Sequence, residues 1–144
     1  MDDIDVERNK LVIRRFLEAV VNTGETDLLS ELVSPACEET DGRVRVHRGV
    51  EGMAEHVRAV RQVYADLHLT ITRQIAEGEW VATQFMARGT HAREWLGVPA
   101  SGMVMTFFGV NIDRIVDGKI VEHGGSADML GPYFEAGLLK PTAP

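Results

Sequence analysis

The sequence predicts an α+β fold in which a strongly curved antiparallel sheet forms a cone, N-terminal helices pack over it, and an apolar pocket lies inside. Apolar residues recur at helical spacing up to about residue 64, whereas apolar and polar residues alternate from residue 67 onward. Helices grouped first and antiparallel strands grouped later are typical of the α+β class. With 144 residues, the chain has room for one domain, 1–144, around one core.

Three helices are expected in the first half of the chain. Residues 6–22 show helical spacing of apolar side chains and end before Gly24, a typical C-terminal cap. A shorter helix is expected over 27–33, capped by Thr26 and ended by Ser34-Pro35. A third runs from about residue 50 to 64, and one of its faces is an apolar stripe formed by Met53, Val57, Val60 and Tyr64.

Four strands and a short final helix are expected in the second half. The strands cover 67–75, 80–91, 103–116 and 119 to about 124, and Asp117-Gly118 is a strong two-residue hairpin turn between the last two. Strands of ~12 residues span ~40 Å, so we expect them to bend around the helices, at Gly89 and Gly109. Residues 128–139 are expected to form the final helix.

Composition excludes several classes of function. The net charge of −7, with basic residues spread among acidic ones, argues against a nucleic-acid partner. No apolar run is long enough for a membrane span, and the start Met1-Asp2-Asp3-Ile4-Asp5 is acidic where a signal peptide would be basic, so a cytoplasmic protein without a membrane partner is expected. The five histidines show no metal-ligand spacing and no glycine-rich nucleotide motif is present, so neither metal nor cofactor is expected. Cys37, the single cysteine, is expected to be a packing residue.

Several short motifs together resemble one family. They are Gly89-Thr90-His91, Trp95-Leu96-Gly97-Val98-Pro99, Asn111-Ile112-Asp113-Arg114, Asp117-Gly118-Lys119-Ile120-Val121-Glu122-His123 and Asp128. In this order and spacing the chain resembles the SnoaL-like polyketide cyclases of the nuclear transport factor 2-like superfold. The resemblance implies a cone with a deep pocket, often a dimer. It also implies ring closure of aromatic polyketides by intramolecular aldol condensation, or, as in close relatives, cofactor-free hydroxylation. The family commonly has tryptophan after Glu-His, where this chain has Gly124.

Three residues are candidates for catalysis. Asp128 matches the family's acid/base aspartate, and its alternative role is to cap the helix that follows. His91 ends a long strand and is a candidate because histidine is a residue type suited to proton transfer, or it is simply a strand-end histidine. Asn111 interrupts an apolar run and could hold a substrate carbonyl, or face outward.

Six further residues are candidates for contact with a flat polycyclic substrate: Trp80, Trp95, Phe107, Met53, His47 and Glu122. Most aromatic and methionine side chains are expected to form core. Glu122 and His123 point to opposite faces of their strand, so at most one of them lines the pocket.

Three functions therefore remain open from the sequence. The first is a cofactor-free cyclase that uses Asp128, His91 and Asn111. The second is a cofactor-independent hydroxylase, and the third is a non-catalytic domain that binds a hydrophobic small molecule. Apolar side chains on both faces of the strand 103–116 predict a homodimer through the outer face of the sheet.

Overall fold

The computed structural model describes residues 3–142, so the first two residues of the acidic start, Met1 and Asp2, lie outside the described residues. The helical segments are α1 (Asp3–Arg15), η1 (Phe16–Val21), η2 (Thr26–Leu28), α2 (Leu29–Leu32), α3 (Gly49–Val63) and α4 (Gly131–Glu135). The strands are β1 (Val33–Thr40), β2 (Arg45–His47), β3 (His68–Glu77), β4 (Trp80–Thr90), β5 (Val104–Val116) and β6 (Lys119–Ala127).

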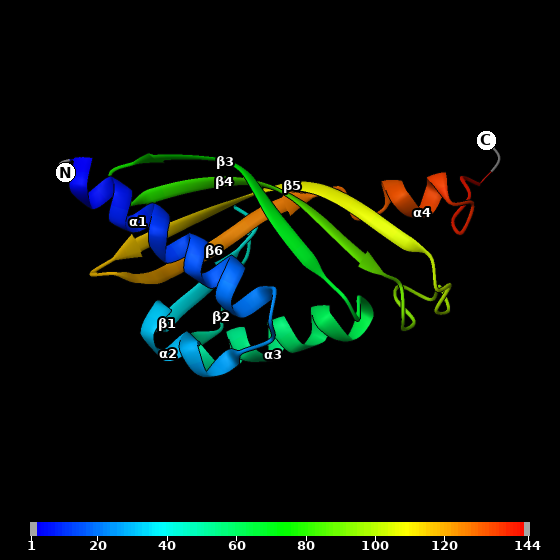
Figure 1. Ribbon diagram of the computed structural model, residues 1–144, viewed down its shortest axis with the longest axis horizontal. Helices are drawn as coiled ribbons and strands as arrows, with labels where there is room; N and C mark the ends of the chain where they lie inside the picture. The colour runs from blue at the N-terminus through cyan, green and yellow to red at the C-terminus, as the bar shows by residue number, and fades with distance from the viewer. Residues whose placement is uncertain (1–2, 143–144) are drawn as a thin grey trace.

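The strands form one curved sheet in the order β2-β1-β6-β5-β4-β3, which is not closed into a barrel. The sheet arches over α1, α2 and α3, and α4 lies at one end (Figure 1). The predicted α+β class with helices packed over a curved sheet is confirmed. The expectation of an all-antiparallel sheet was wrong in one place, because β1 pairs with β6 in parallel.

Two other expectations needed correction. The helix ends before Ser34-Pro35 as expected, but these two residues already belong to β1, and β1 and β2 extend the sheet beyond the predicted hairpins. The expected helix over 128–139 is only the five-residue α4. It is short because Gly137, with a φ of 74°, adopts a left-handed conformation that ends the helix.

Gly89 and Gly109 allow close packing on the concave face of the sheet. A Cβ at Gly89 would lie 2.7 Å from the Cβ of Tyr64, and one at Gly109 would lie 2.6 Å from the Cβ of Ala127. Neither strand tolerates a side chain there, although a bend at these glycines stays a prediction.

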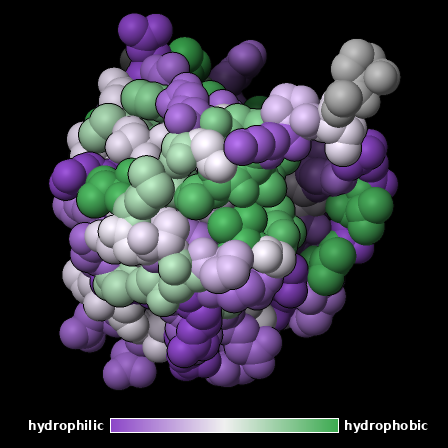
Figure 2. Space-filling view, turned by 90° about the vertical axis from the view of Figure 1, so that its right-hand side faces the viewer, coloured by the Kyte–Doolittle hydropathy of each residue, from purple (hydrophilic) through white to green (hydrophobic). Residues whose placement is uncertain are grey.

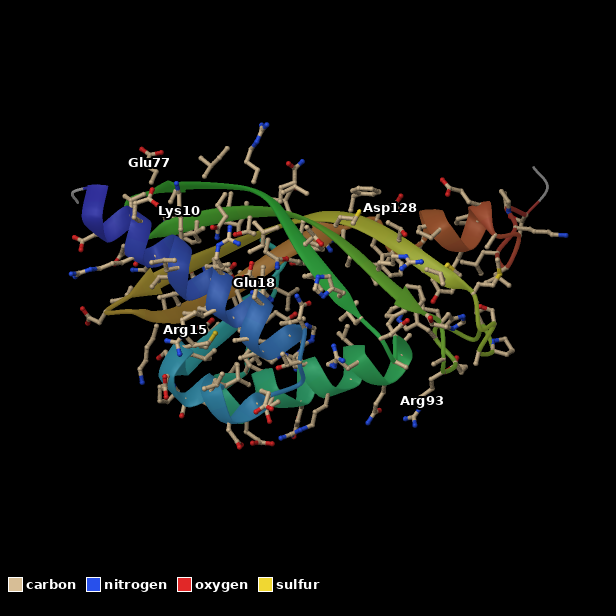
Figure 3. The ribbon with its side chains drawn as sticks, in the orientation of Figure 1. Lys10, Arg15, Glu18, Glu77, Arg93 and Asp128 are labelled. Atoms are coloured by element: carbon tan, nitrogen blue, oxygen red, sulfur yellow. The ribbon has the colours of Figure 1, made fainter. Side chains whose placement is uncertain are left out.

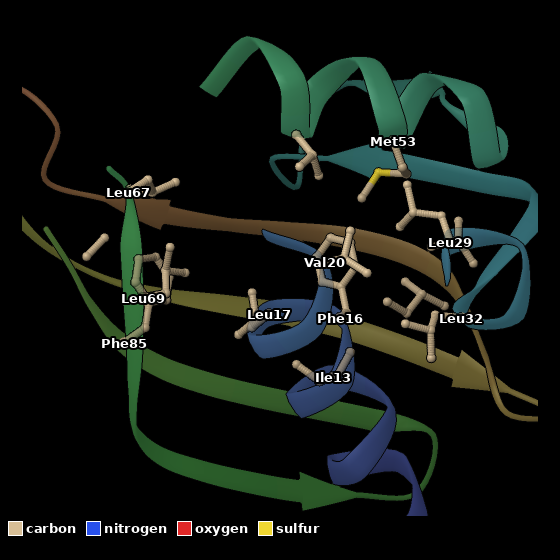
Figure 4. Packing of buried hydrophobic residues seen from close by; sticks show 14 of the residues in the cluster. Ile13, Phe16, Leu17, Val20, Leu29, Leu32, Met53, Leu67, Leu69 and Phe85 are labelled. Atoms are coloured by element: carbon tan, nitrogen blue, oxygen red, sulfur yellow. The ribbon is translucent and has the colours of Figure 1, made fainter. Parts of the chain in front are cut away.

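The core lies between the helices and the concave face. Phe16 and Val20 of η1 pack near Met53 of α3 and Leu32 of α2, while Leu67, Leu69 and Phe85 lie further along the sheet (Figure 4). All are buried. Burial of these side chains holds the helices against the concave face of the sheet. None of the helices between residues 3 and 142 has the length and apolar character needed to span a bilayer.

Candidate active site

A cavity of about 520 Å³ lies between η1, α3 and the concave face of the sheet. Its walls are mainly apolar and include Phe16, Leu17, Val57, Val60, Leu69, Phe85 and Phe107. Ionisable and amide side chains interrupt this wall at Glu39, Asp41, Arg48, His56, Asn111 and His123. Cavities that bury small organic ligands commonly have this size and this predominance of apolar walls with a few polar groups.

Asp113 and His123 form a buried pair at the cavity wall. They lie opposite each other on β5 and β6, and His123 Nδ1 lies 2.5 Å from Asp113 Oδ1. Asp113 is 1% exposed, and its Oδ2 has no hydrogen-bond partner among the described residues. Because Asp113 holds Nδ1, Nε2 is the ring nitrogen that remains to meet a ligand.

A β-bulge decides that His123 is the partner of Asp113. Counted outward from the Asp117-Gly118 turn, a regular hairpin would place Glu122 opposite Asp113. The register shifts by one residue between Arg114 and Ile115, so His123 takes that place and faces inward. Glu122 then lies opposite Arg114 and accepts a hydrogen bond from Arg45.

The two histidines of the cavity differ in their electrostatic surroundings. Burial alone would lower the pKa of His123, but the charge and hydrogen bond of Asp113, with Glu39, raise it above its usual value. Burial lowers the pKa of His56. The positive charges of His123 and Arg48 lower it further, and the negative charge of Glu39 offsets this lowering only in part. Their ring centroids lie 6.3 Å apart. The surroundings therefore favour the charged form of the His123 imidazole and the neutral form of the His56 imidazole.

Glu39 and Arg48 complete this part of the wall. Arg48 Nε donates a hydrogen bond to Glu39 Oε2 at 2.6 Å. Burial would raise the pKa of Glu39, but this hydrogen bond and the nearby positive charges lower it, so the carboxylate stays charged. Glu39 lies opposite His123 in the parallel pairing of β1 and β6, which the sequence did not predict.

Two of the predicted site residues line the cavity. Phe107 is buried on the concave face of β5 and packs edge-on against Tyr64, with ring centroids 4.9 Å apart. Asn111, two residues before Asp113 and on the same face of β5, is half-buried and also faces the cavity. Both are placed where a substrate would meet them, and their binding roles stay predictions.

Asp128 and His91 lie outside the cavity lining. Asp128 follows β6 just before α4 (Figure 3), its side chain is exposed, and its Oδ1 accepts a hydrogen bond from the Gly131 amide at 2.8 Å. This contact satisfies the first amide of α4, but Leu130 and not Asp128 stands at the N-cap position, because the helix begins at Gly131. His91 is fully buried with Nδ1 2.9 Å from Ser101 Oγ, and its Nε2 has no hydrogen-bond partner within residues 3–142. Catalytic roles for both stay predictions.

The other five predicted contacts also lie away from the lining. Trp80 is exposed at the start of β4 and His47 is exposed on β2, whereas Met53 is buried in the core. Trp95 packs on Tyr133, with ring centroids 5.0 Å apart. Glu122 accepts a hydrogen bond from Arg45 on the face of β6 opposite to His123. Substrate contact by these five residues stays a prediction. The position of the cavity does not favour it, because none of them lines the cavity.

Sequence reasoning missed Glu39, His56 and Asp113 as members of one cluster. His56 stands one position before Val57 of the apolar stripe, and that placement on the inward edge of α3 was the available signal. Asp113 and His123 required the bulge, which no local pattern reveals.

Metal and thiol chemistry find little support in the described residues. Within residues 3–142 no three His, Cys, Asp or Glu side chains are grouped so that they could hold a metal ion. Burial and the nearby Asp113 carboxylate raise the pKa of Cys37 to about 12, so its thiol stays protonated.

This fold and cavity agree with comparisons to known proteins. The family model for SnoaL-like polyketide cyclase matches residues 11–134, and the chain belongs to this family, as its motifs predicted. It is similar to the aklanonic acid methyl ester cyclase DauD of Streptomyces sp. (strain C5), at 32% identity over 91% of this chain and 83% of that protein. The aklanonic acid methyl ester cyclase DnrD of Streptomyces peucetius is 31% identical over 91% and 92%. The solved structure of TsrD from Streptomyces laurentii is 27% identical, with a TM-score of 0.81 over 96% of this chain and 99% of that one.

Proposed function

We propose that this protein closes a ring of a polycyclic aromatic polyketide ester by intramolecular aldol condensation, without a cofactor. The observation that supports this most strongly is the apolar cavity of about 520 Å³, in which Glu39, His56 and His123 gather at one part of the wall. The apolar part would hold the flat ring system and the ionisable part would transfer protons. Its relatives DauD and DnrD are named for a methyl ester substrate of this kind.

Aldol ring closure suits such a site because it needs no oxidant or reductant. A proton leaves the carbon beside one carbonyl, the resulting enolate carbon bonds to a second carbonyl carbon, and that carbonyl oxygen takes up a proton. Asn111 would donate a hydrogen bond from its amide to a substrate carbonyl. Proton transfer by Asp128, assisted by His91, is one assignment within this proposal, and the Asp128→Asn variant described below tests it.

The test is turnover of aklanonic acid methyl ester, with the free acid as the matched substrate. We expect the purified protein to cyclise the ester and to turn over the acid more slowly. The acid carries a carboxylate that must leave water to enter a mainly apolar cavity. Absence of any cyclised product from either substrate would contradict the proposal.

The same assay examines Asp128. If this carboxylate transfers a proton, Asp128→Asn should lower kcat by about 100-fold or more. If it only accepts the hydrogen bond from the Gly131 amide, the variant should keep both its kcat and its stability, because the amide oxygen of asparagine can accept the same hydrogen bond.

Two alternatives remain distinguishable by their products. A hydroxylase would consume oxygen in step with a hydroxylated product, whereas cyclisation consumes none. A binding domain would hold the polycyclic ester tightly and release it unchanged.

A further inference from the structure

The cavity wall contains two proton-transfer groups for which the family's aspartate pattern gives no role. His56 on α3 and His123 on β6 come from segments 67 positions apart, yet their rings meet edge to face at a centroid distance of 6.3 Å. Both line the cavity. A hydrogen bond spans about 3 Å between heavy atoms, so rings at this distance can reach neighbouring groups of one substrate molecule.

The fixed position of His123 comes from Asp113 and Phe16. The Asp113 carboxylate is buried and holds Nδ1, while the Phe16 ring packs edge-on against the imidazole at a centroid distance of 5.6 Å. An imidazole held in this way has one orientation, and it can carry a positive charge because Asp113 supplies a negative one beside it. His123 is thus arranged as a proton donor toward the cavity.

His56 has no such carboxylate bound to its ring. Its charged neighbours are Glu39 and Arg48, which are hydrogen-bonded to each other, and His123 across the cavity wall. The side chain is half-buried on the inward edge of α3. A neutral imidazole in these surroundings is arranged as a proton acceptor.

We propose that His56 removes the proton from the carbon beside one substrate carbonyl and that His123 donates a proton to the oxygen of the carbonyl under attack. This rests on the proposed function. As the C–H bond breaks, its electron pair forms the enolate, whose carbon makes the new C–C bond, and the π electrons of the acceptor carbonyl move to oxygen. His123 protonates that oxygen. His56 then loses its proton to solvent and His123 regains one, so no net charge or electrons are exchanged.

Asp113 is a positioning residue in this mechanism, since it acts only through His123. Two groups whose environments drive their pKa values apart are a common sign of an acid and a base working together. The pKa of His56 is lowered and that of His123 is raised from a common 6.5. The cyclisation rate should therefore rise as pH increases through the pKa of His56, and fall as it increases through that of His123.

The experiment compares wild type with His56→Asn, His123→Asn and Asp113→Asn, and uses His68→Asn as the matched control on an exposed part of β3. We expect kcat to fall about 100-fold or more in each cavity histidine variant and to stay unchanged in the control. Asp113→Asn should move the falling limb of the pH–rate profile to lower pH, because His123 loses the charge that keeps it protonated. A merely structural role of Asp113 would lower the rate without moving this limb.

An NMR titration of the histidine rings gives a readout that needs no substrate. In wild type, His123 should titrate above 6.5 and His56 below it. The opposite order would overturn the proposal. Because this titration uses wild-type protein, it remains decisive even if a variant fails to fold. Wild-type kcat in both histidine variants, with loss of activity in Asp128→Asn, would also overturn the proposal and leave the cyclase function intact. Failure of wild type to cyclise any ester would instead count against the proposed function.

Discussion

Gly124 lies where the family commonly has tryptophan, and its surroundings explain why this chain has no side chain there. A Cβ at Gly124 would overlap the carbonyl oxygen of Thr40 on the neighbouring parallel strand β1. The absent side chain therefore reflects close backbone approach as well as the shape of the cavity wall.

Substitution of Gly124 should be costly for stability. We expect Gly124→Ala to lower the free energy of unfolding by about 1–3 kcal/mol, because β1 must move away from β6. Urea unfolding measures this, with Ser126→Ala, an exposed position of the same strand, as the control. Equal stability of the two variants would show that β1 can shift without strain.

At the level of single residues, the sequence predicted part of the site. The alternation along residues 104–113 placed Phe107 and Asn111 on one face, and both line the cavity. It did not place His123 against Asp113, because one extra residue in β6 changes the pairing. Asp128 matched a family position, but its contact with Gly131 depends on how the chain turns into α4.

Among the elements, the four strands with clear alternation and the helix at 49–63 agree with the prediction within a few residues. β1 was missed because Ser34-Pro35 and the polar run Glu38-Glu39-Thr40 look like a loop, and because its parallel partner lies far away in sequence. Local patterns report burial and periodicity, whereas pairing between distant segments is set by the whole fold.

Arg61 joins three of these elements. Its Nη1 donates to the carbonyl oxygens of Val21 and Asn22, at the end of η1, and of Leu67, just before β3, at 3.0, 3.1 and 3.0 Å. The carbonyls at the end of a helical segment lack partners within it, so this guanidinium satisfies them and ties α3 to η1.

We therefore expect Arg61→Met, which keeps much of the apolar stem, to lower the free energy of unfolding by about 1.5–3 kcal/mol. The matched control is Arg58→Met on the same helix. Arg58 makes an exposed ion pair with Glu51, so its loss should change stability by at most about 1 kcal/mol. Chemical denaturation of both variants provides the measurement, and equal losses would contradict the role of Arg61.

On the scale of the whole molecule, several exposed apolar side chains lie together at each of two places on the surface of residues 3–142. The first place is the end of the molecule that bears α4 and the loop between β4 and β5, where apolar residues gather in the middle of the surface (Figure 2). Exposed apolar residues of these segments include Leu96, Met103, Leu130 and Phe134. The second place is the outer face of the sheet, opposite the cavity. This face was predicted to mediate a homodimer.

The pairing register shows how far the apolar outer face extends. Ile112 on β5 lies beside Ala82 on β4, which lies beside Ile75 on β3. Four residues away along the same face, Phe108 on β5 lies beside Met86 on β4. Phe108 is 63% exposed, Ile75 62% and Ile112 51%. Monomers rarely leave contiguous apolar patches of this kind in water, and a twofold contact lets one patch cover its own copy.

We expect the protein at micromolar concentration to sediment at twice the 15.9 kDa of one chain. Phe108→Glu should return it to the mass of one chain, because a carboxylate in the middle of an apolar interface would be buried without a partner. Leu11→Glu is the matched control, since Leu11 is 57% exposed on α1, on the helical side of the sheet, and its substitution should leave the dimer intact. A wild-type mass of one chain at every concentration would contradict the dimer, and a Phe108→Glu dimer would place the contact on another surface, such as the end that bears α4.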